Sequence, residues 1–144
     1  MTLHGHDGAP VPGPALDPAD AELVERARAV MRRCFRPGYH HVASALRTTT
    51  GQVFEGVHLE ASVGRIAVCA EAIALGSAAL AGDTDVDLIV AVDRDGNVVS
   101  PCGMCREMLL DFAPAARVVI PSPEGETVVS AESLLPSKYR RRHN

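Results

Sequence analysis

The sequence of 144 residues has no tryptophan and few other aromatic residues, with only two tyrosines and three phenylalanines. Large aromatic side chains therefore cannot fill its core, which we expect to be built from alanine, valine, leucine and isoleucine. Hydrophobic residues still make up 47% of the chain, enough for the core of one domain of this length. The sequence thus predicts a single domain with an aliphatic core.

An excess of positive charge is also missing, because 14 Lys and Arg stand against 18 Asp and Glu. A nonspecific nucleic-acid binder needs a basic surface to displace counterions from phosphates, so we expect no nucleic-acid partner. No apolar run approaches the roughly 20 residues of a membrane span, and the N-terminus lacks the order of a signal peptide. These absences predict no membrane partner and a cytoplasmic location, where cysteines are expected as thiols or metal ligands.

The composition divides the chain into three parts. Residues 1–16 are rich in His, Gly and Pro and have almost nothing to bury, which predicts a disordered N-terminal leader. Residues 17–139 are expected to form the single domain, and residues 140–144 a basic C-terminal tail.

Hydrophobic periodicity predicts alternating helices and strands. Asp17-Pro18 supplies an N-cap and a first-turn proline for a helix that ends near Cys34, a residue we expect on its apolar face. The run 87–92 is typical of a strand buried on both faces. We expect helices at about 18–34, 69–81 and 101–113, strands at about 42–49, 52–58, 87–92, 98–99, 118–120 and 127–129, and a helical turn at 131–135. This order predicts an α/β fold in which helices sandwich a mixed sheet, and Met108, Leu109 and Phe112 are expected to point inward.

Three cysteines at two sites form the strongest motif. Cys69-Ala70-Glu71 opens one expected helix, and Pro101-Cys102-Gly103-Met104-Cys105 opens another. A C-x-x-C pair alone is compatible with a redox dithiol or with half of a structural zinc site. Cys69 adds a third thiolate, and a tetrahedral zinc with three protein ligands keeps one corner open for water. The pattern therefore favours a catalytic zinc held by Cys69, Cys102 and Cys105.

The expected helix ends favour thiolates, because unpaired backbone amides and the helix dipole place positive partial charge there. Three thiolates and one Zn²⁺ still leave a net charge of −1, which a nearby cation would offset. Arg106 follows the last ligand directly, and it is the candidate for this charge compensation.

Glu71 lies two residues after Cys69, so it is expected to reach a zinc-bound water without binding the metal. A carboxylate at that place can take a proton from the water and pass it to a ring nitrogen and a leaving amine. Zinc nucleobase deaminases combine a Cys₃ or His/Cys₂ zinc site, a non-ligand Glu and a Pro-Cys-x-x-Cys motif. These residues therefore predict hydrolytic removal of an amine as ammonia, with Glu71 as proton shuttle.

At these motifs the chain resembles the cytidine deaminase family, and more closely its blasticidin-S deaminase branch. The segment 134–139 and Ala72, where cytidine deaminases usually carry an arginine, resemble that branch in particular. Because that arginine is missing, the resemblance implies a more important role for Arg106, and secondarily for Arg65, in compensating the thiolate charge. The resemblance implies a three-layer α/β/α sandwich with a mixed central sheet of about five strands, one zinc per subunit, and a homotetramer whose sites are completed by neighbouring subunits. It implies a hydrolase acting on C–N bonds of cyclic amidines, with Ala70 and Pro101 at the substrate.

The chain departs from the family where the substrate is held. The family's Gly-x-Asn-x-Glu, whose Asn and Glu hold sugar hydroxyls, is here Gly56-Val57-His58-Leu59-Glu60. The family's aromatic residue near the nucleoside falls at about His40. We therefore predict that His58, Glu60 and His40 bind the substrate, a small molecule such as cytidine, deoxycytidine or blasticidin S.

Three alternatives stay open from the sequence. The substrate could be a different aminated heterocycle. A nucleic-acid deaminase of the same fold is disfavoured by the negative charge and by the lack of an aromatic, basic groove. A structural zinc protein or redox switch would not require Glu71 beside the ligands.

Overall fold

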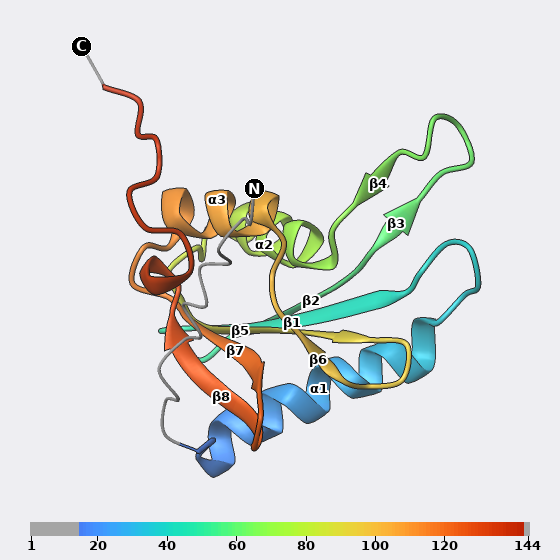
Figure 1. The fold of residues 1–144 in the computed structure, drawn as a ribbon, viewed down its shortest axis with the longest axis horizontal. Helices are drawn as coiled ribbons and strands as arrows, with labels where there is room; N and C mark the ends of the chain where they lie inside the picture. Colours follow the sequence, from blue (N-terminus) through green and yellow to red (C-terminus); the bar gives the residue numbers. More distant parts are fainter. Residues whose placement is uncertain (1–14, 143–144) are drawn as a thin grey trace, which may run out of the picture.

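The computed structural model describes residues 15–142, so most of the expected leader and residues 143–144 lie outside the described residues. Three α-helices surround a sheet in three layers, with α1 on one face and α2 and α3 together on the other (Figure 1). The helices are α1 (Pro18–Cys34), α2 (Ala70–Leu80) and α3 (Gly103–Phe112), and a short 3₁₀ turn, η1 (Glu132–Leu134), is the last helical element of the described residues. The helices of the described range are too short or too polar to span a membrane.

Within residues 15–142 the main sheet runs in the order β2-β1-β5-β7-β8, with the short strand β6 beside β5. Only β5 and β7 among these strands pair in parallel, which makes the sheet mixed. The strands are β1 (Val42–Thr48), β2 (Val53–Val57), β5 (Val86–Asp93), β6 (Val98–Val99), β7 (Arg117–Ser122) and β8 (Gly125–Ser130). This confirms the α/β sandwich with a mixed sheet of about five strands.

The core lies on both faces of the sheet, as the apolar run around residue 90 predicts. Successive strand residues point to opposite faces. Leu88 and Val90 accordingly pack with α1, whereas Ile89 packs with the side chains of α2 and α3. The buried residues are almost all Ala, Val, Leu and Ile, which confirms the aliphatic core.

Local signals set the helix ends well. The side chain of Asp17 caps α1 by accepting a hydrogen bond from the backbone N–H of Asp20 at 2.8 Å, and Pro18 is the first helical residue. Gly82 follows α2 with φ of +71°, the left-handed conformation that glycine adopts at no steric cost.

One expectation fails at the end of α3. Phe112 is 57% exposed at the end of α3, and Leu110 is buried in the place expected for it. The segment before Cys69 contains two strands that the sequence did not predict, because β3 (Leu59–Glu60) and β4 (Ala67–Val68) form a separate two-stranded arm. This arm projects from the three layers on the side of α2 (Figure 1). Arg65 lies exposed in its turn with φ of +53°.

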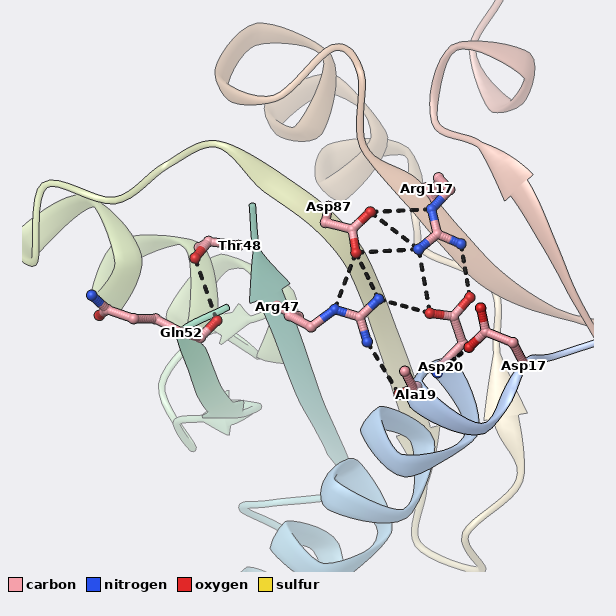
Figure 2. A network of polar contacts seen from close by, with 8 residues as sticks. All are labelled: Asp17, Ala19, Asp20, Arg47, Thr48, Gln52, Asp87 and Arg117. Atoms are coloured by element: carbon pink, nitrogen blue, oxygen red, sulfur yellow. Dashed lines mark hydrogen bonds and ion pairs between the residues drawn. The ribbon is translucent and has the colours of Figure 1, made fainter. Parts of the chain in front are cut away.

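Four charged residues join α1 to three neighbouring segments of the sheet (Figure 2). Asp20, 3% exposed, accepts hydrogen bonds from Arg47 and Arg117, each at 2.7 Å. Asp87 bonds the same two arginines, at 2.6 Å from Arg47 and 3.1 Å from Arg117. The four residues, which we call the Asp20 network, alternate in charge and bring together the starts of α1, β5 and β7 with the end of β1.

Candidate active site

The N-termini of α2 and α3 bring three cysteines together. Cys69 is the N-cap of α2, Cys102 is the N-cap of α3, and Cys105 lies in the first turn of α3. Their Sγ atoms all lie within 4.8 Å of one another, and those of Cys69 and Cys102 are 3.3 Å apart. Neither N-cap cysteine makes a side-chain hydrogen bond that caps its helix, and the two sulfurs contact each other.

This cluster fits zinc. With Zn–S bonds of about 2.3 Å, tetrahedral zinc holds its thiolates about 3.8 Å apart, within the range that these sulfurs span. Three sulfur donors suit zinc and are a poor match for magnesium or calcium, which bind oxygen. Cys69, Cys102 and Cys105 therefore form a cluster that could hold the zinc ion.

Without a cation the cluster opposes its own ionisation. Burial raises the pKa of Cys69 to about 11, helped by its contact with Cys102. Burial and the negative charges of Glu71 and the other two thiols raise the pKa of Cys105. The pKa of Cys102 is lowered despite burial, because the backbone N–H groups of Cys105 and Met104 and the neighbouring thiols stabilise its thiolate. A divalent cation is what such a cluster needs to become fully deprotonated.

Glu71 is buried directly beside the cysteines. It is the second residue of α2 and only 5% exposed. Burial raises the pKa of its carboxyl group, while hydrogen bonds from its own backbone N–H and from Cys105 partly lower it. A buried carboxyl group with a raised pKa can both accept and return a proton near neutral pH.

A cavity of 150 Å³ connects the cysteines with Glu71. It is lined by Val42, His58, Cys69, Ala70, Glu71, Val99, Ser100 and Cys102. Of the residues expected at the substrate, His58 and Ala70 lie on its wall. Pro101 lines a narrow adjoining space together with Glu71 and residues of β5 and β7.

The sequence did not indicate Val42, Val99 or Ser100 as cavity residues. Val42 and Val99 look like any strand valine, so no local signal marks them. Ser100 had a usable signal, because it stands directly before the Pro-Cys-x-x-Cys motif, where the chain leaves β6 for the zinc site.

His40 and Glu60 both contact His58 and are not among the residues that line the cavity. The ring of His40 donates a hydrogen bond from Nδ1 to the backbone oxygen of His58 at 2.8 Å. Glu60 Oε2 lies 3.1 Å from His58 Nε2. Their direct contact with substrate stays a prediction.

Arg106 forms hydrogen bonds that stabilise the start of α3. Its Nε donates to the carbonyl of Pro101 at 2.8 Å, and its Nη1 donates to the carbonyl of Leu134 at 2.9 Å. These bonds hold the residue before Cys102 and the η1 turn against the first turn of α3. Compensation of thiolate charge by Arg106 stays a prediction.

A larger groove, of 760 Å³, lies between α3 and residues 138–141, away from the cysteines. Three of its charged side chains pair with each other, since Lys138 Nζ lies 2.7 Å from Glu107 Oε2 and 3.1 Å from Asp111 Oδ1. Because the smaller cavity holds the thiols and the buried carboxyl group, we place the chemistry there despite its size.

Comparisons with known proteins agree with this geometry. The family profile "Cytidine and deoxycytidylate deaminase zinc-binding region" matches residues 18–121. Blasticidin-S deaminase from Bacillus cereus is 46% identical over 130 residues, which cover 85% of this chain and 93% of that protein.

Solved structures show the same fold. Cytidine deaminase from Burkholderia pseudomallei is 31% identical with a TM-score of 0.71, over 83% of this chain and 98% of that chain. The Mycobacterium leprae cytidine deaminase has a TM-score of 0.71 at 26% identity, over 81% of this chain and 97% of that chain. Since the family profile covers most of the chain and the relatives align over nearly their full length, this protein belongs to the zinc-dependent cytidine deaminase family, hydrolases that act on C–N bonds of cyclic amidines.

Proposed function

We propose that this protein removes the exocyclic amine of a free cytosine-type nucleoside or nucleoside analogue, such as cytidine or blasticidin S. The observation that carries the proposal is the shared cavity in which Glu71 lies beside Cys69 and Cys102. The names of the relatives support this substrate class, since they are a blasticidin-S deaminase and cytidine deaminases.

In the proposed reaction Glu71 carries the protons. Bound zinc supplies Lewis acidity and lowers the pKa of water toward neutrality. Glu71 accepts a proton from the attacking water and delivers it to the ring nitrogen next to the reacting carbon. A second proton passes through Glu71 to the amine, the C–N bond breaks, the new C–O bond becomes a carbonyl, and ammonia leaves. The burial of Glu71 suits this role, because its carboxyl group is shielded from bulk water.

We further propose that the protein is a homotetramer with one zinc per subunit and with sites completed by neighbouring subunits. A cavity of 150 Å³ is well below the roughly 300 Å³ usual for pockets that enclose a small-molecule ligand. Residues from another copy would supply the missing wall. The four free cysteines favour a reducing compartment, so we also propose a cytoplasmic location.

A screen for ammonia release tests the proposal. The wild-type protein with bound zinc is offered cytidine, deoxycytidine, blasticidin S and other aminated heterocycles, together with the variant Glu71→Gln as control. We expect turnover of at least one cytosine compound, and a loss of at least about 100-fold in kcat for Glu71→Gln, since a positioned acid–base group contributes about that much or more. Zinc content should be equal in the two proteins. A zinc-loaded wild type inactive on every compound would favour a structural zinc protein.

A further inference from the structure

His58 occupies a fixed place on the wall of the active-site cavity. It follows β2 directly, and its side chain is only 13% exposed. Its backbone N–H donates to the carbonyl of Val42 at 2.9 Å, so the backbone of residue 58 is held to the start of β1. The cavity wall next to it includes Cys69 and Glu71.

Both ring nitrogens of His58 are already used within the chain. The backbone N–H of His41 donates to Nδ1 at 2.9 Å, so Nδ1 must carry a lone pair. The neutral ring then has its proton on Nε2, which donates to Glu60 Oε2 at 3.1 Å. His58 therefore has no free nitrogen with which to bind a substrate.

His41 also holds the ring in orientation, and His40 holds the backbone of residue 58. The rings of His41 and His58 meet edge to face, with centroids 5.6 Å apart and planes at 79°. His40 Nδ1 donates to the backbone oxygen of His58. A ring restrained in this way can fix the position of the group that it contacts.

That group is the carboxylate of Glu60, whose side chain is 39% exposed. One oxygen accepts the bond from His58, and within residues 15–142 the other oxygen, Oε1, has no hydrogen-bond partner. The cavity of 150 Å³ is below the roughly 300 Å³ usual for pockets that enclose a ligand, so we expect the substituent of the ring to extend beyond it. His58 is on that wall, and Glu60 is its immediate neighbour.

We infer that His58 is a positioning residue that does not itself bind substrate, and that it aims Glu60 Oε1 at a hydrogen-bond donor on the substituent of the aminated ring. This edge of the site then presents only hydrogen-bond acceptors to the substituent. It favours a substrate whose substituent carries a hydroxyl or ammonium group. The inference rests on the proposed deaminase function.

Selectivity between two substrates tests the inference. Cytidine, or blasticidin S if the screen selects it, carries donors on its substituent, whereas 1-methylcytosine carries none. We define selectivity as kcat/KM for the donor-bearing substrate divided by kcat/KM for 1-methylcytosine. We expect His58→Ala and Glu60→Gln each to lower this ratio by about tenfold, as expected for one lost charged hydrogen bond. The loss should appear mainly in KM. The double variant should lose no more than the worse single variant, because both act through one contact.

His58→Gln is the matched control. A glutamine amide can place its N–H near the position of Nε2 and so donate to Glu60, whereas alanine cannot. We expect His58→Gln to keep the ratio within about threefold of wild type, a difference of less than 1 kcal/mol. Additive losses in the double variant, or equal losses for Gln and Ala, would overturn the inference.

Nitrogen-15 NMR of histidine rings gives a readout that needs no activity. We expect the wild type to show His58 neutral, with Nε2 protonated and Nδ1 unprotonated at pH 7.5. The opposite tautomer or an imidazolium would refute the inference even in an active enzyme. If instead the zinc-loaded protein releases no ammonia from any compound, the proposed function fails, while the NMR result still decides the state of His58.

Discussion

At the scale of single residues, the three-cysteine cluster includes a thiol that solvent cannot reach. Cys105 is fully buried in the first turn of α3, whereas Cys69 is half-buried and Cys102 exposed. Its pKa is raised by burial and by neighbouring negative charge. A divalent cation bound at the three cysteines would stabilise the ionised form of this buried thiol.

We predict that Cys105→Ser binds zinc at least about 100-fold more weakly, because a serine hydroxyl is a hard ligand that stays protonated near neutral pH. Titration with a competing chelator, with zinc measured by elemental analysis, checks this. Cys34→Ser is the control, since Cys34 lies at the end of α1 among the side chains packed on the α1 face. It should keep one zinc per chain. Equal zinc loss in both variants would argue against the three-cysteine site.

At the scale of elements, the placement of α2 depends on one glycine in β2. A Cβ atom at Gly56 would lie 2.3 Å from the carbonyl oxygen of Ala70 and 2.7 Å from the backbone nitrogen of Ala74. Both are backbone atoms of the first turns of α2, so they cannot move aside as a flexible side chain could. The strand and the helix that presents Glu71 therefore approach as closely as they do because residue 56 has no side chain.

We predict that Gly56→Ala lowers the free energy of unfolding by about 2 kcal/mol, a typical cost of overpacking. It should also lower kcat, since α2 carries Cys69 and Glu71 and must shift away from β2. Urea unfolding and the ammonia assay measure the two effects.

Gly76→Ala is the matched control on α2, where a Cβ would meet nothing within 4 Å. It should be neutral or stabilising by up to about 1 kcal/mol, because alanine is the better helix former. A Gly56→Ala protein as stable as Gly76→Ala would contradict the close approach.

At the scale of the whole molecule, the Asp20 network joins α1 to the sheet far from the cavity. Burial alone would raise the pKa of Asp20, but hydrogen bonds from Arg117 and Arg47 outweigh it and hold that pKa below its ordinary value of 3.8. Asp87 and Asp20 in turn raise the pKa of both arginines. The network lies at the start of β5, whereas Val99 of the cavity wall pairs with Ala91 near the other end of that strand.

We predict that Asp20→Asn lowers the free energy of unfolding by about 3 kcal/mol at pH 7, because two arginines lose a buried charged partner. Since the pKa of folded Asp20 lies below that of the unfolded chain, its contribution is present above about pH 4 and is lost as the pH falls through the folded value. Urea unfolding between pH 7 and 3 should therefore show a shallower pH dependence in Asp20→Asn than in wild type.

The exposed ion pair of Arg33 and Glu55 is the control for the loss of stability in Asp20→Asn. Arg33→Ala should change stability by less than about 1 kcal/mol, as is usual for surface ion pairs. Equal effects of Asp20→Asn and Arg33→Ala would show that the Asp20 network contributes no more than a surface contact.

The sequence by itself determined the features that depend on near neighbours in the chain. Helical spacing and caps gave α1 its bounds, and the apolar run around residue 90 predicted a strand buried on both faces. The spacing of Cys69, Glu71, Cys102 and Cys105 predicted the zinc chemistry, because each motif is a local start of a helix. Phe112 was misplaced because helical periodicity near a helix end does not say where the neighbouring layer stops.

Only the tertiary structure decided the contacts between segments distant in sequence. It gave the strand order, the close approach of Gly56 to α2, and the Asp20 network drawn from four separate elements. It also showed that both ring nitrogens of His58 make hydrogen bonds, to His41 and to Glu60, which the pattern Gly-x-His-x-Glu could not reveal. Such pairings depend on packing between elements rather than on the conformation of any one of them, and a local sequence pattern carries no information about which partner each element meets.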